Sequence, residues 1–169
     1  GHVQPVHAAR ALTAEQPNTI FRNTGGGRFE ALTEEAGLTA QPPRRHRGSA
    51  FGDFNGDGRL DVVTVSISGP AEIWMNDSPA AGHWLELRLE GKRSNRDAIG
   101  ARIKVTTKAG AQYGHVTTAC GYASSSAGPA HFGLGADVAA TVEIRWPSGQ
   151  MQRLENVKAD AVVKVVEPR

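Results

Sequence analysis

The residues best suited to chemistry lie in one short stretch, residues 53–61, which is rich in oxygen-bearing side chains. Positions one, three, five and nine of this stretch are Asp53, Asn55, Asp57 and Asp61. Position six is Gly58, which permits the sharp bend of a loop wrapped round an ion, and position seven is Arg59, whose backbone carbonyl can point inward. Oxygen donors at this spacing are typical of a Ca²⁺ site. We therefore predict that calcium is bound by Asp53, Asn55, Asp57, Arg59 and Asp61.

The predicted ion is calcium rather than magnesium, because Ca²⁺ accepts about six to eight oxygens in irregular geometry. Without a cation, carboxylates this close together would repel one another by about 1 to 4 kcal/mol per pair. An EF-hand is excluded, since position twelve is Thr64 where that motif places a bidentate glutamate. The alternative is a turn whose Asp and Asn side chains bond their own backbone. The loop holds no nucleophile or base, so we expect a structural ion that joins two strands.

Two weaker groupings of reactive side chains occur later in the chain. Cys120 with His115 and His131 would supply a thiol and a base. Ser124–Ser126 with the same histidines would supply a hydrolase site, but Ser125 lies in no Gly-x-Ser-x-Gly elbow. Cys120 is explained as well by a strand end where a small residue fits, and His131 by a satisfied polar neighbour. We therefore predict no catalytic residue.

Aromatic and polar side chains suggest binding surfaces. Trp84, Trp146 and Tyr122 would form a platform for stacking sugars, although core packing accounts for the same aromatics. Residues 94–97 read either as a polar binding loop or as a long turn. Residues 44–47 carry three arginines but no aromatic side chain for stacking bases, so they read as a solvated loop. The expected class of ligand is a protein or a glycan.

The composition narrows the class of protein. With 19 basic and 17 acidic residues the net charge is +2, so no broad field of one sign is available to hold nucleic acid. The single cysteine excludes an internal disulfide and a multi-cysteine zinc site. No stretch is apolar for long enough to span a bilayer. Twenty Gly and nine Pro with 6% aromatic residues favour short strands and tight turns, and hence an all-β fold.

The N-terminal half reads as a tail followed by short strands. Residues 1–18 predict a tail, whose weakly helical run at residues 8–15 ends before Pro17. The elements expected next are a hairpin at 19–32, one helical turn at 33–38 closed by Gly37, strands at 49–53, 60–67 and 71–75, and a linker at 76–82. We therefore place the unit that carries the calcium loop at residues 19–79.

Residues 83–169 show a cleaner alternation of apolar and polar side chains. Leu85, Leu87 and Leu89 share one side of the first strand, and Trp84 lies on the charged side. The strands expected here are 83–90, 101–106, 111–118, 131–135, 141–146, 150–155 and 161–167. Strands with one apolar face bury it by pairing two sheets or by closing a barrel, so we predict an antiparallel β-sandwich or barrel for this unit.

Two family resemblances rest on motifs in these units. Residues 48–63, Gly-Ser-Ala-Phe-Gly-Asp-Phe-Asn-Gly-Asp-Gly-Arg-Leu-Asp-Val-Val, resemble an FG-GAP/VCBS repeat, the calcium-binding blade unit of integrin-type β-propellers. The resemblance implies that Asp53, Asn55, Asp57 and Asp61 supply side-chain ligands and Arg59 a carbonyl. Asn55 stands where Asp is commoner, which implies a slightly weaker site. At most one blade's worth of repeat is present, so we expect residues 19–75 to shield their strand edges by packing on the C-terminal sandwich.

Residues 83–168 are similar to the ASPIC/UnbV domain of the cartilage acidic protein 1 family. The similarity is carried by Ser-Asn-Arg-Asp-Ala-Ile-Gly-Ala-Arg at 94–102, His-Phe-Gly-Leu-Gly at 131–135 and Trp-Pro-Ser-Gly at 146–149, while Cys120 stands where glycine is usual. The resemblance implies a module that follows a propeller in secreted or cell-envelope proteins. Some bacterial relatives occur among enediyne biosynthesis proteins.

The combined expectation is a calcium-stabilised, non-catalytic binding or adhesion-type module, extracellular or periplasmic, that recognises a protein or glycan. The alternative is an accessory or tailoring protein in enediyne-type natural-product biosynthesis, with the region of Cys120, His115 and His131 as its pocket. The sequence leaves the ligand, the oligomeric state and the roles of Cys120 and of the Trp84 and Trp146 surface open.

Overall fold

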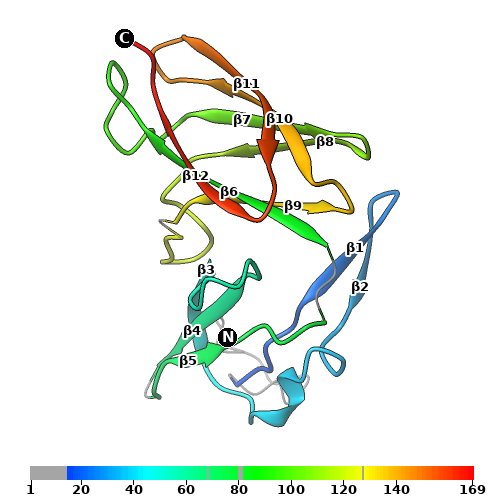
Figure 1. The fold of residues 1–169 in the computed structure, drawn as a ribbon. Coiled ribbons are helices and arrows are strands. Elements are labelled where there is room, and N and C mark those ends of the chain that lie inside the picture. Colours follow the sequence, from blue (N-terminus) through cyan, green and yellow to red (C-terminus); the bar gives the residue numbers. More distant parts are fainter. Residues whose placement is uncertain (1–14, 68, 80–81, 127) are drawn as a thin grey trace.

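The computed structural model describes residues 15–67, 69–79, 82–126 and 128–169, which form twelve strands and one short 3₁₀ helix (Figure 1). The predicted all-β fold class is therefore confirmed. The weakly helical run expected at residues 8–15 lies outside the described residues, except for Glu15, as do residues 80 and 81 of the expected linker. The described residues include no helix of the length and hydrophobicity that a membrane crossing needs.

The N-terminal strands form a hairpin and a small antiparallel sheet. The elements are β1 (Phe21–Gly25), β2 (Arg28–Ala31), the 3₁₀ helix η1 (Leu38–Ala40), β3 (His46–Gly52), β4 (Asp61–Ser66) and β5 (Glu72–Trp74). β1 pairs with β2 across a glycine turn, as expected, and the sheet has the order β3-β4-β5. The helical turn expected at 33–38 forms, and Gly37 closes it. Ala36 N–H donates to the Leu32 carbonyl, and Gly37, with φ 69°, and Leu38 donate to the Glu34 and Thr33 carbonyls before η1 begins.

The C-terminal strands form two facing sheets, which agrees with the predicted sandwich. The elements are β6 (His83–Glu90), β7 (Arg102–Thr107), β8 (Gly110–His115), β9 (Ala130–Gly135), β10 (Ala139–Arg145), β11 (Met151–Lys158) and β12 (Ala161–Val166). One sheet has the order β11-β10-β7-β8 and the other β12-β6-β9. The pairing of β12 with β6 is parallel, which departs from a purely antiparallel sandwich. β8 ends at His115, so Cys120 lies in the following loop and not at a strand end.

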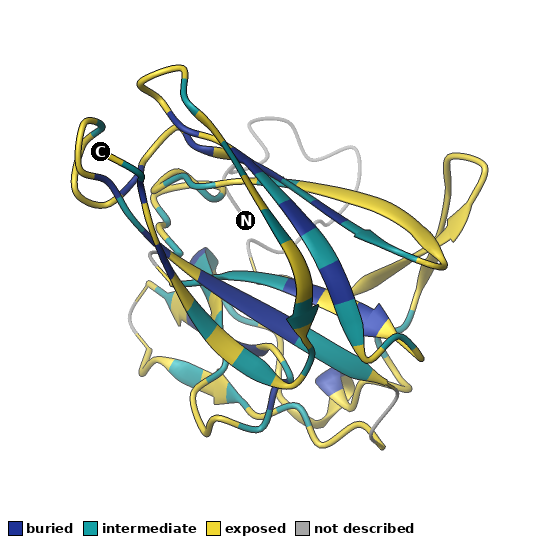
Figure 2. Ribbon diagram, turned by 45° about the horizontal axis from the view of Figure 1, so that its top comes forward, coloured by how far each residue is buried: buried dark blue, intermediate teal, exposed yellow. Residues whose placement is uncertain are grey.

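The hydrophobic core lies between these two sheets (Figure 2). Leu85 and Leu87 on β6 are at most 1% exposed, because the period-two alternation of a strand sends them to the same side. Trp146 is buried with them, and its Nε1 donates to Gln152 Oε1 at 3.0 Å. Trp146 is therefore a core residue, whereas Tyr122 is 60% exposed. The sugar-stacking platform of three aromatics does not form.

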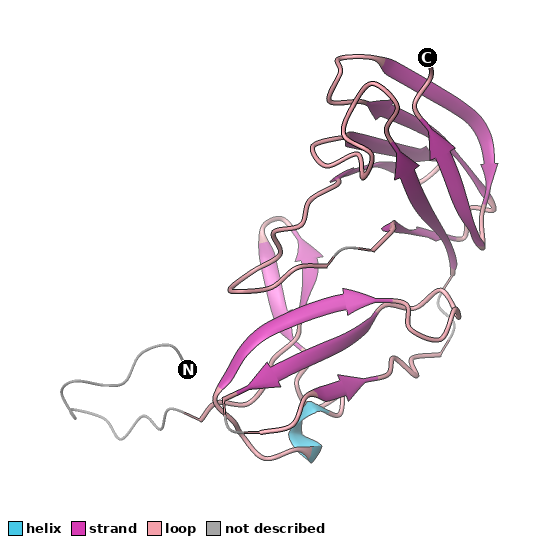
Figure 3. Cartoon of the chain, turned by 90° about the vertical axis from the view of Figure 1, so that its left-hand side faces the viewer, coloured by secondary structure: helices cyan, strands magenta, loops and turns pink. Residues whose placement is uncertain are grey.

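The N-terminal strands bury much less apolar surface. Figure 3 shows them at one end of the molecule and the sandwich at the other. Phe21, Phe29 and Ile73 are each more than 60% exposed. Among the described residues before 83, Leu38 is the single buried hydrophobic residue, and it lies outside the core cluster of the sandwich. These strands therefore lack a core of the size that the sandwich has, and they depend on contacts with other elements for their stability.

The last strand is followed at once by a buried carboxylate. Glu167 is 2% exposed. Its Oε2 accepts hydrogen bonds from the backbone N–H groups of Lys92, Arg93 and Ser94 at 2.7–2.8 Å. Its Oε1 accepts from the Ser94 and Ser148 hydroxyls at 2.9 and 2.6 Å. Burial raises the pKa of Glu167, but these hydrogen bonds outweigh it and lower the pKa to about 2.

This carboxylate explains two of the motifs in the C-terminal unit. Ser94 opens the polar stretch 94–97, and Ser148 belongs to the turn 146–149. Both serines donate to Glu167, and the Ser148 N–H also donates to Ser94 Oγ at 3.1 Å. The stretch that read either as a binding loop or as a turn is thus held by the end of the chain. Its structural role is to close one end of the sandwich.

We predict that Glu167→Gln lowers the melting temperature at neutral pH by roughly 5 °C or more, because an amide cannot accept five hydrogen bonds. The folded pKa of about 2 lies below the ordinary value of 4.5. The contribution of Glu167 is therefore present above about pH 4.5 and is lost as the pH falls toward 2. Melting curves at several pH values check this. A Glu34→Gln control in an exposed turn should follow the parent, and equal acid sensitivity of parent and Glu167→Gln would contradict the assignment.

Candidate metal centre

The stretch 53–61 forms the loop between β3 and β4, whose last paired residues are Gly52 and Asp61. Asp53 organises the start of this loop. Its Oδ1 accepts from the N–H groups of Gly56 and Asp57 at 2.7 and 3.1 Å, and its Oδ2 accepts from Gly58 N–H at 2.8 Å. Gly56 and Gly58 have φ angles of 76° and 84°, which glycine adopts without strain. The loop therefore wraps round the Asp53 carboxylate.

Asp61 anchors the other end of the loop. It is fully buried, and its Oδ2 accepts from Phe54 N–H while its Oδ1 accepts from Asn76 N–H, each at 2.8 Å. Arg59 also reaches the segment after β5, because its Nε donates to the Asn76 carbonyl at 2.7 Å. Asp61 and Arg59 thus tie the loop to the end of the β3-β4-β5 sheet.

Asp57 is the loop carboxylate that contacts a positive charge. Its Oδ1 accepts from Arg59 N–H at 2.8 Å, and its Oδ2 accepts from Arg59 Nη2 at 2.5 Å and from Asn55 Nδ2 at 2.7 Å. The backbone hydrogen bond from Arg59 is the largest cause that holds the pKa of Asp57 below its ordinary value, with Asn55 and the guanidinium contributing. The guanidinium supplies the positive charge that this oxygen attracts.

The donor chemistry of the loop fits a hard cation, because every predicted ligand is an oxygen and the two glycines give the required bends. The oxygens are, however, satisfied largely by the backbone of the loop itself. In the described ranges no three His, Cys, Asp or Glu side chains lie together in an arrangement that could hold a metal ion. In its geometry the loop is therefore a turn whose side chains bond its own backbone. The chemical types of its donors nevertheless suit calcium.

Two aromatic side chains of the sandwich pack on this loop. The Trp84 and His131 rings are stacked, with centroids 6.2 Å apart and planes 7° from parallel. His131 Nε2 lies 2.8 Å from the Gly58 carbonyl oxygen, to which it donates in the Nε2–H tautomer. A Cβ on Gly58 would lie 2.0 Å from Trp84 Nε1, so only glycine fits under the indole. The loop is therefore the point where the N-terminal sheet meets the sandwich.

Comparison with known proteins assigns both parts. Residues 9–64 match the family model of the FG-GAP-like repeat, and residues 91–169 match that of ASPIC and UnbV. The chain is an FG-GAP-like repeat followed by an ASPIC and UnbV domain. The resemblances drawn from the motifs are therefore confirmed.

The chain is similar to cartilage acidic protein 1 from three vertebrates. The protein of Homo sapiens is 29% identical over 167 residues, which are 94% of this chain and 25% of the relative. The protein of Xenopus tropicalis is 31% identical over 147 residues, which are 83% of this chain and 23% of the relative. The chain spans about a quarter of the length of the curated relatives it matches.

A serine-rich loop of the ASPIC and UnbV domain covers the edge of the FG-GAP-like repeat. Ser124 Oγ accepts from Ser49 N–H at 2.9 Å, and Ser126 Oγ accepts from Phe51 N–H at 3.1 Å. Ser49 and Phe51 are two residues apart on the edge strand β3, whose outward N–H groups need acceptors. The repeat thus shields this edge with the sandwich, as expected. Sequence reasoning missed these contacts, because 75 residues separate each pair.

The sequence-predicted pocket of a thiol and two histidines does not come together. The backbone N–H of Cys120 donates to the Ser124 carbonyl at 3.2 Å. His131 is engaged with Gly58 and Trp84. Among the described residues no hydrogen bond joins the Cys120 thiol to His115 or His131. The serines and His131 instead form the contact between the two parts of the chain.

We predict that Gly58→Ala destabilises the chain more than Gly56→Ala. Both residues have positive φ, so each alanine is strained by about 1 kcal/mol, but only the methyl at position 58 collides with Trp84. That collision should add about 1 to 3 kcal/mol, which urea denaturation measures. Gly56 has open space around it and is the matched control. Equal losses in the two variants would show that Trp84 does not pack on the loop in solution.

Proposed function

We propose that the chain is a calcium-stabilised, non-catalytic module of an extracellular protein, in which the loop at 53–61 holds the FG-GAP-like repeat against the ASPIC and UnbV domain. The observation that carries the proposal is the position of this loop. It is anchored to the β3-β4-β5 sheet through Asp61 and is contacted from the sandwich by Trp84 and His131. A cation that orders the loop would therefore also order the contact between the FG-GAP-like repeat and the ASPIC and UnbV domain.

The residues that would hold the cation are Asp53, Asn55, Asp57 and Asp61 through side-chain oxygens and Arg59 through its carbonyl. Bound calcium would supply the positive charge that offsets repulsion among the three carboxylates. Of these oxygens, Asp57 Oδ2 now accepts from the Arg59 guanidinium and the Asn55 amide. The role of Arg59 is to keep this carboxylate paired, and release of its guanidinium would make Asp57 Oδ2 available as a ligand.

The location and the absence of catalysis rest on the relatives and on the contacts of reactive groups. The similar proteins carry the name cartilage acidic protein 1, which supports an extracellular location. Neither matched domain is that of a known enzyme family. Ser124, Ser126 and His131, which could serve a hydrolase, are used as hydrogen-bonding partners at the junction. These contacts support a structural role for them.

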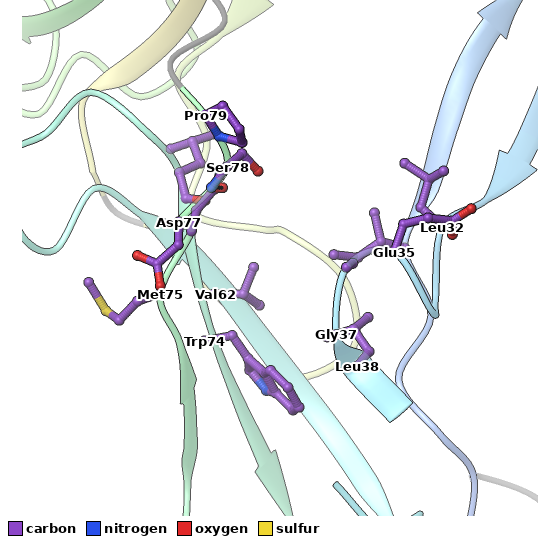
Figure 4. A pocket seen from close by; sticks show the side chains of 14 residues that line it. Leu32, Glu35, Gly37, Leu38, Val62, Trp74, Met75, Asp77, Ser78 and Pro79 are labelled. Atoms are coloured by element: carbon purple, nitrogen blue, oxygen red, sulfur yellow. Dashed lines mark hydrogen bonds between the residues drawn. The ribbon is translucent and has the colours of Figure 1, made fainter. Parts of the chain in front are cut away.

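The exposed apolar surface of the FG-GAP-like repeat supports recognition of a polypeptide rather than a glycan. A groove of about 710 Å³ lies between the η1 region and β4 and β5, and it is lined by apolar side chains that include Leu38, Val62 and Trp74 (Figure 4). Exposed apolar surface of this kind suits the apolar side chains of a polypeptide.

We predict that calcium raises the melting temperature of the chain relative to the same protein in excess chelator. If the dissociation constant is near 10 µM, about 1 mM Ca²⁺ adds about 2.7 kcal/mol of stability. For a chain of this size that corresponds to a rise of roughly 5 to 10 °C. Differential scanning calorimetry with and without calcium makes the measurement.

The matched variants are Asp57→Ala in the loop and Asp97→Ala outside it. Asp57→Ala should abolish most of the calcium-dependent rise, because it removes a charged ligand. Asp97 is an exposed residue paired with Arg96, so Asp97→Ala should keep the full rise. A parent protein with identical melting curves in calcium and in chelator would refute the calcium proposal.

A further inference from the structure

The outer face of the sheet β11-β10-β7-β8 carries a row of exposed basic side chains. Arg102 is the first residue of β7 and Arg145 the last of β10, and the register of these antiparallel strands pairs them directly. Their neighbours Ile103 and Ile144 are buried in the core, so both arginines point to the opposite, solvent-facing side. His115 on β8 is paired with Arg102 and extends the row. We call these three residues the basic row.

The two arginines of the basic row lie opposite each other without an acidic partner. Directly opposite residues on antiparallel strands have Cβ atoms about 5 Å apart, and like charges at this distance destabilise a sheet. No hydrogen bond or ion pair joins the guanidinium of Arg102 or of Arg145 to another residue in the part of the chain that the structure describes. A single exposed arginine is ordinary, whereas this pair is unfavourable until an anion neutralises it.

The next row on the same face is balanced. Two residues along the strands, Glu143 on β10 lies opposite Lys104 on β7 and Arg153 on β11. The Glu143 carboxylate is 2.9 Å from Lys104 Nζ and 3.4 Å from Arg153 Nη1. Arg153 Nε also lies 2.5 Å from Glu155 Oε1. Glu143 and Glu155 are therefore already paired, and neither neutralises the basic row.

The basic row adjoins the two motifs that Glu167 holds together. Arg102 is the last residue of the stretch 94–102, and Arg145 directly precedes the turn 146–149. The Glu167 carboxylate accepts hydrogen bonds from serine hydroxyls of both segments. The two arginines are therefore presented from a fixed backbone, which reduces the conformational entropy lost on binding.

Exposed apolar and aromatic side chains flank the basic row. Met151 on β11 is paired with Arg145 and is 63% exposed. Tyr113 lies two residues before His115 on the same face of β8, diagonal to Arg102, and is 77% exposed. Arginine, tyrosine and methionine are enriched at protein interfaces, and arginine and tyrosine are frequent among the residues that contribute most to binding. This combination favours a polypeptide over a sulfated glycan, which would need the positive charges alone.

We propose that the basic row, with Met151 and Tyr113 beside it, is a docking surface for an acidic polypeptide segment. Carboxylates of the segment pair with Arg102 and Arg145, and its apolar side chains contact Met151 and Tyr113. A guanidinium group binds a carboxylate in bidentate geometry, so two adjacent arginines select two neighbouring carboxylates. Binding also removes the repulsion between the arginines.

This docking surface is separate from the sites described above. It lies on the sheet β11-β10-β7-β8, whereas the loop at 53–61 and the groove beside Trp74 belong to the FG-GAP-like repeat at the other end of the molecule (Figure 1). The proposal therefore goes beyond the calcium-stabilised module and does not depend on it.

The test uses the full chain and a fluorescent copolymer of glutamate and tyrosine as the acidic probe, with binding followed by fluorescence anisotropy. We expect Arg102→Gln and Arg145→Gln each to lower the affinity by roughly tenfold, because each removes a charge-assisted bidentate pair. Binding by the parent should weaken as salt is added, since the charges are exposed. Equal affinity of the parent and the double variant would overturn the proposal, as would a parent that does not bind the probe.

Arg153→Gln is the matched control, because Arg153 lies on the same face and undergoes the same change of charge but is already paired with two acids. It should change the affinity by no more than about twofold. A loss as large as that of Arg102→Gln would show that only net charge matters and would overturn the assignment to the basic row.

Melting curves separate loss of binding from loss of folding. Arg102→Gln should melt at the parent's temperature or slightly above it at low salt, because it removes a like-charge contact. Arg102→Lys covers the case in which Arg102→Gln does not fold. It keeps the charge but not the planar fork, so it should bind the probe more weakly than the parent. Unchanged binding by Arg102→Lys would contradict bidentate pairing and overturn the proposal.

The class of ligand is decided by Met151→Ser, titrated with the copolymer and with a heparin oligosaccharide. We expect this variant to bind the copolymer about threefold to tenfold more weakly, because an apolar contact is lost, and to leave any heparin binding unchanged. Copolymer binding that is insensitive to Met151→Ser, or binding of heparin alone, would overturn the polypeptide assignment. In sedimentation, a parent that dimerises beside a monomeric double variant would show that a second copy occupies this face and would overturn it as well.

Discussion

A carboxylate that leaves water must recover its hydrogen bonds from the protein, and this requirement shapes both parts of the chain. Glu167 gathers three backbone N–H groups and two hydroxyls at the closed end of the sandwich. Asp61 does the same between Phe54 and Asn76, where the loop meets the end of β5. In each case the acid draws together segments that share no strand pairing. The buried acids therefore fix the loops, while the apolar side chains fix the sheets.

The two parts of the chain differ in how much of their stability comes from contacts within each part. The sandwich buries leucine, isoleucine and valine side chains from both of its sheets, and its core extends to Trp146. The FG-GAP-like repeat has three strands and a separate hairpin, with Phe21, Phe29 and Ile73 exposed. Small sheets of this kind need a surface to pack on. The sandwich offers the serine hydroxyls that cap β3 and the Trp84 and His131 rings that hold the loop.

Local patterns predicted most strands of the sandwich well, because strands such as β7 and β10 alternate apolar and polar side chains. The leucines of β6 and the glycine turn between β1 and β2 need no distant information. The contacts between the two parts of the chain could not be predicted from local patterns. Ser124 and Ser126 look like any polar loop until the edge of β3 lies beside them. The parallel pairing of β12 likewise depends on where the chain crosses, which no periodicity encodes.

If the loop binds the proposed cation, its position would make ion binding and domain contact one equilibrium. Gly58 belongs to the loop through the Asp53 carboxylate and to the junction through His131 and Trp84. Any free energy that a cation adds to the order of this loop is shared with the contact against the sandwich. By reciprocity, a tighter contact must raise the affinity for the cation by the same factor. An isolated FG-GAP-like loop would therefore bind its ion more weakly than the same loop held by its neighbour, and the difference measures the strength of the junction.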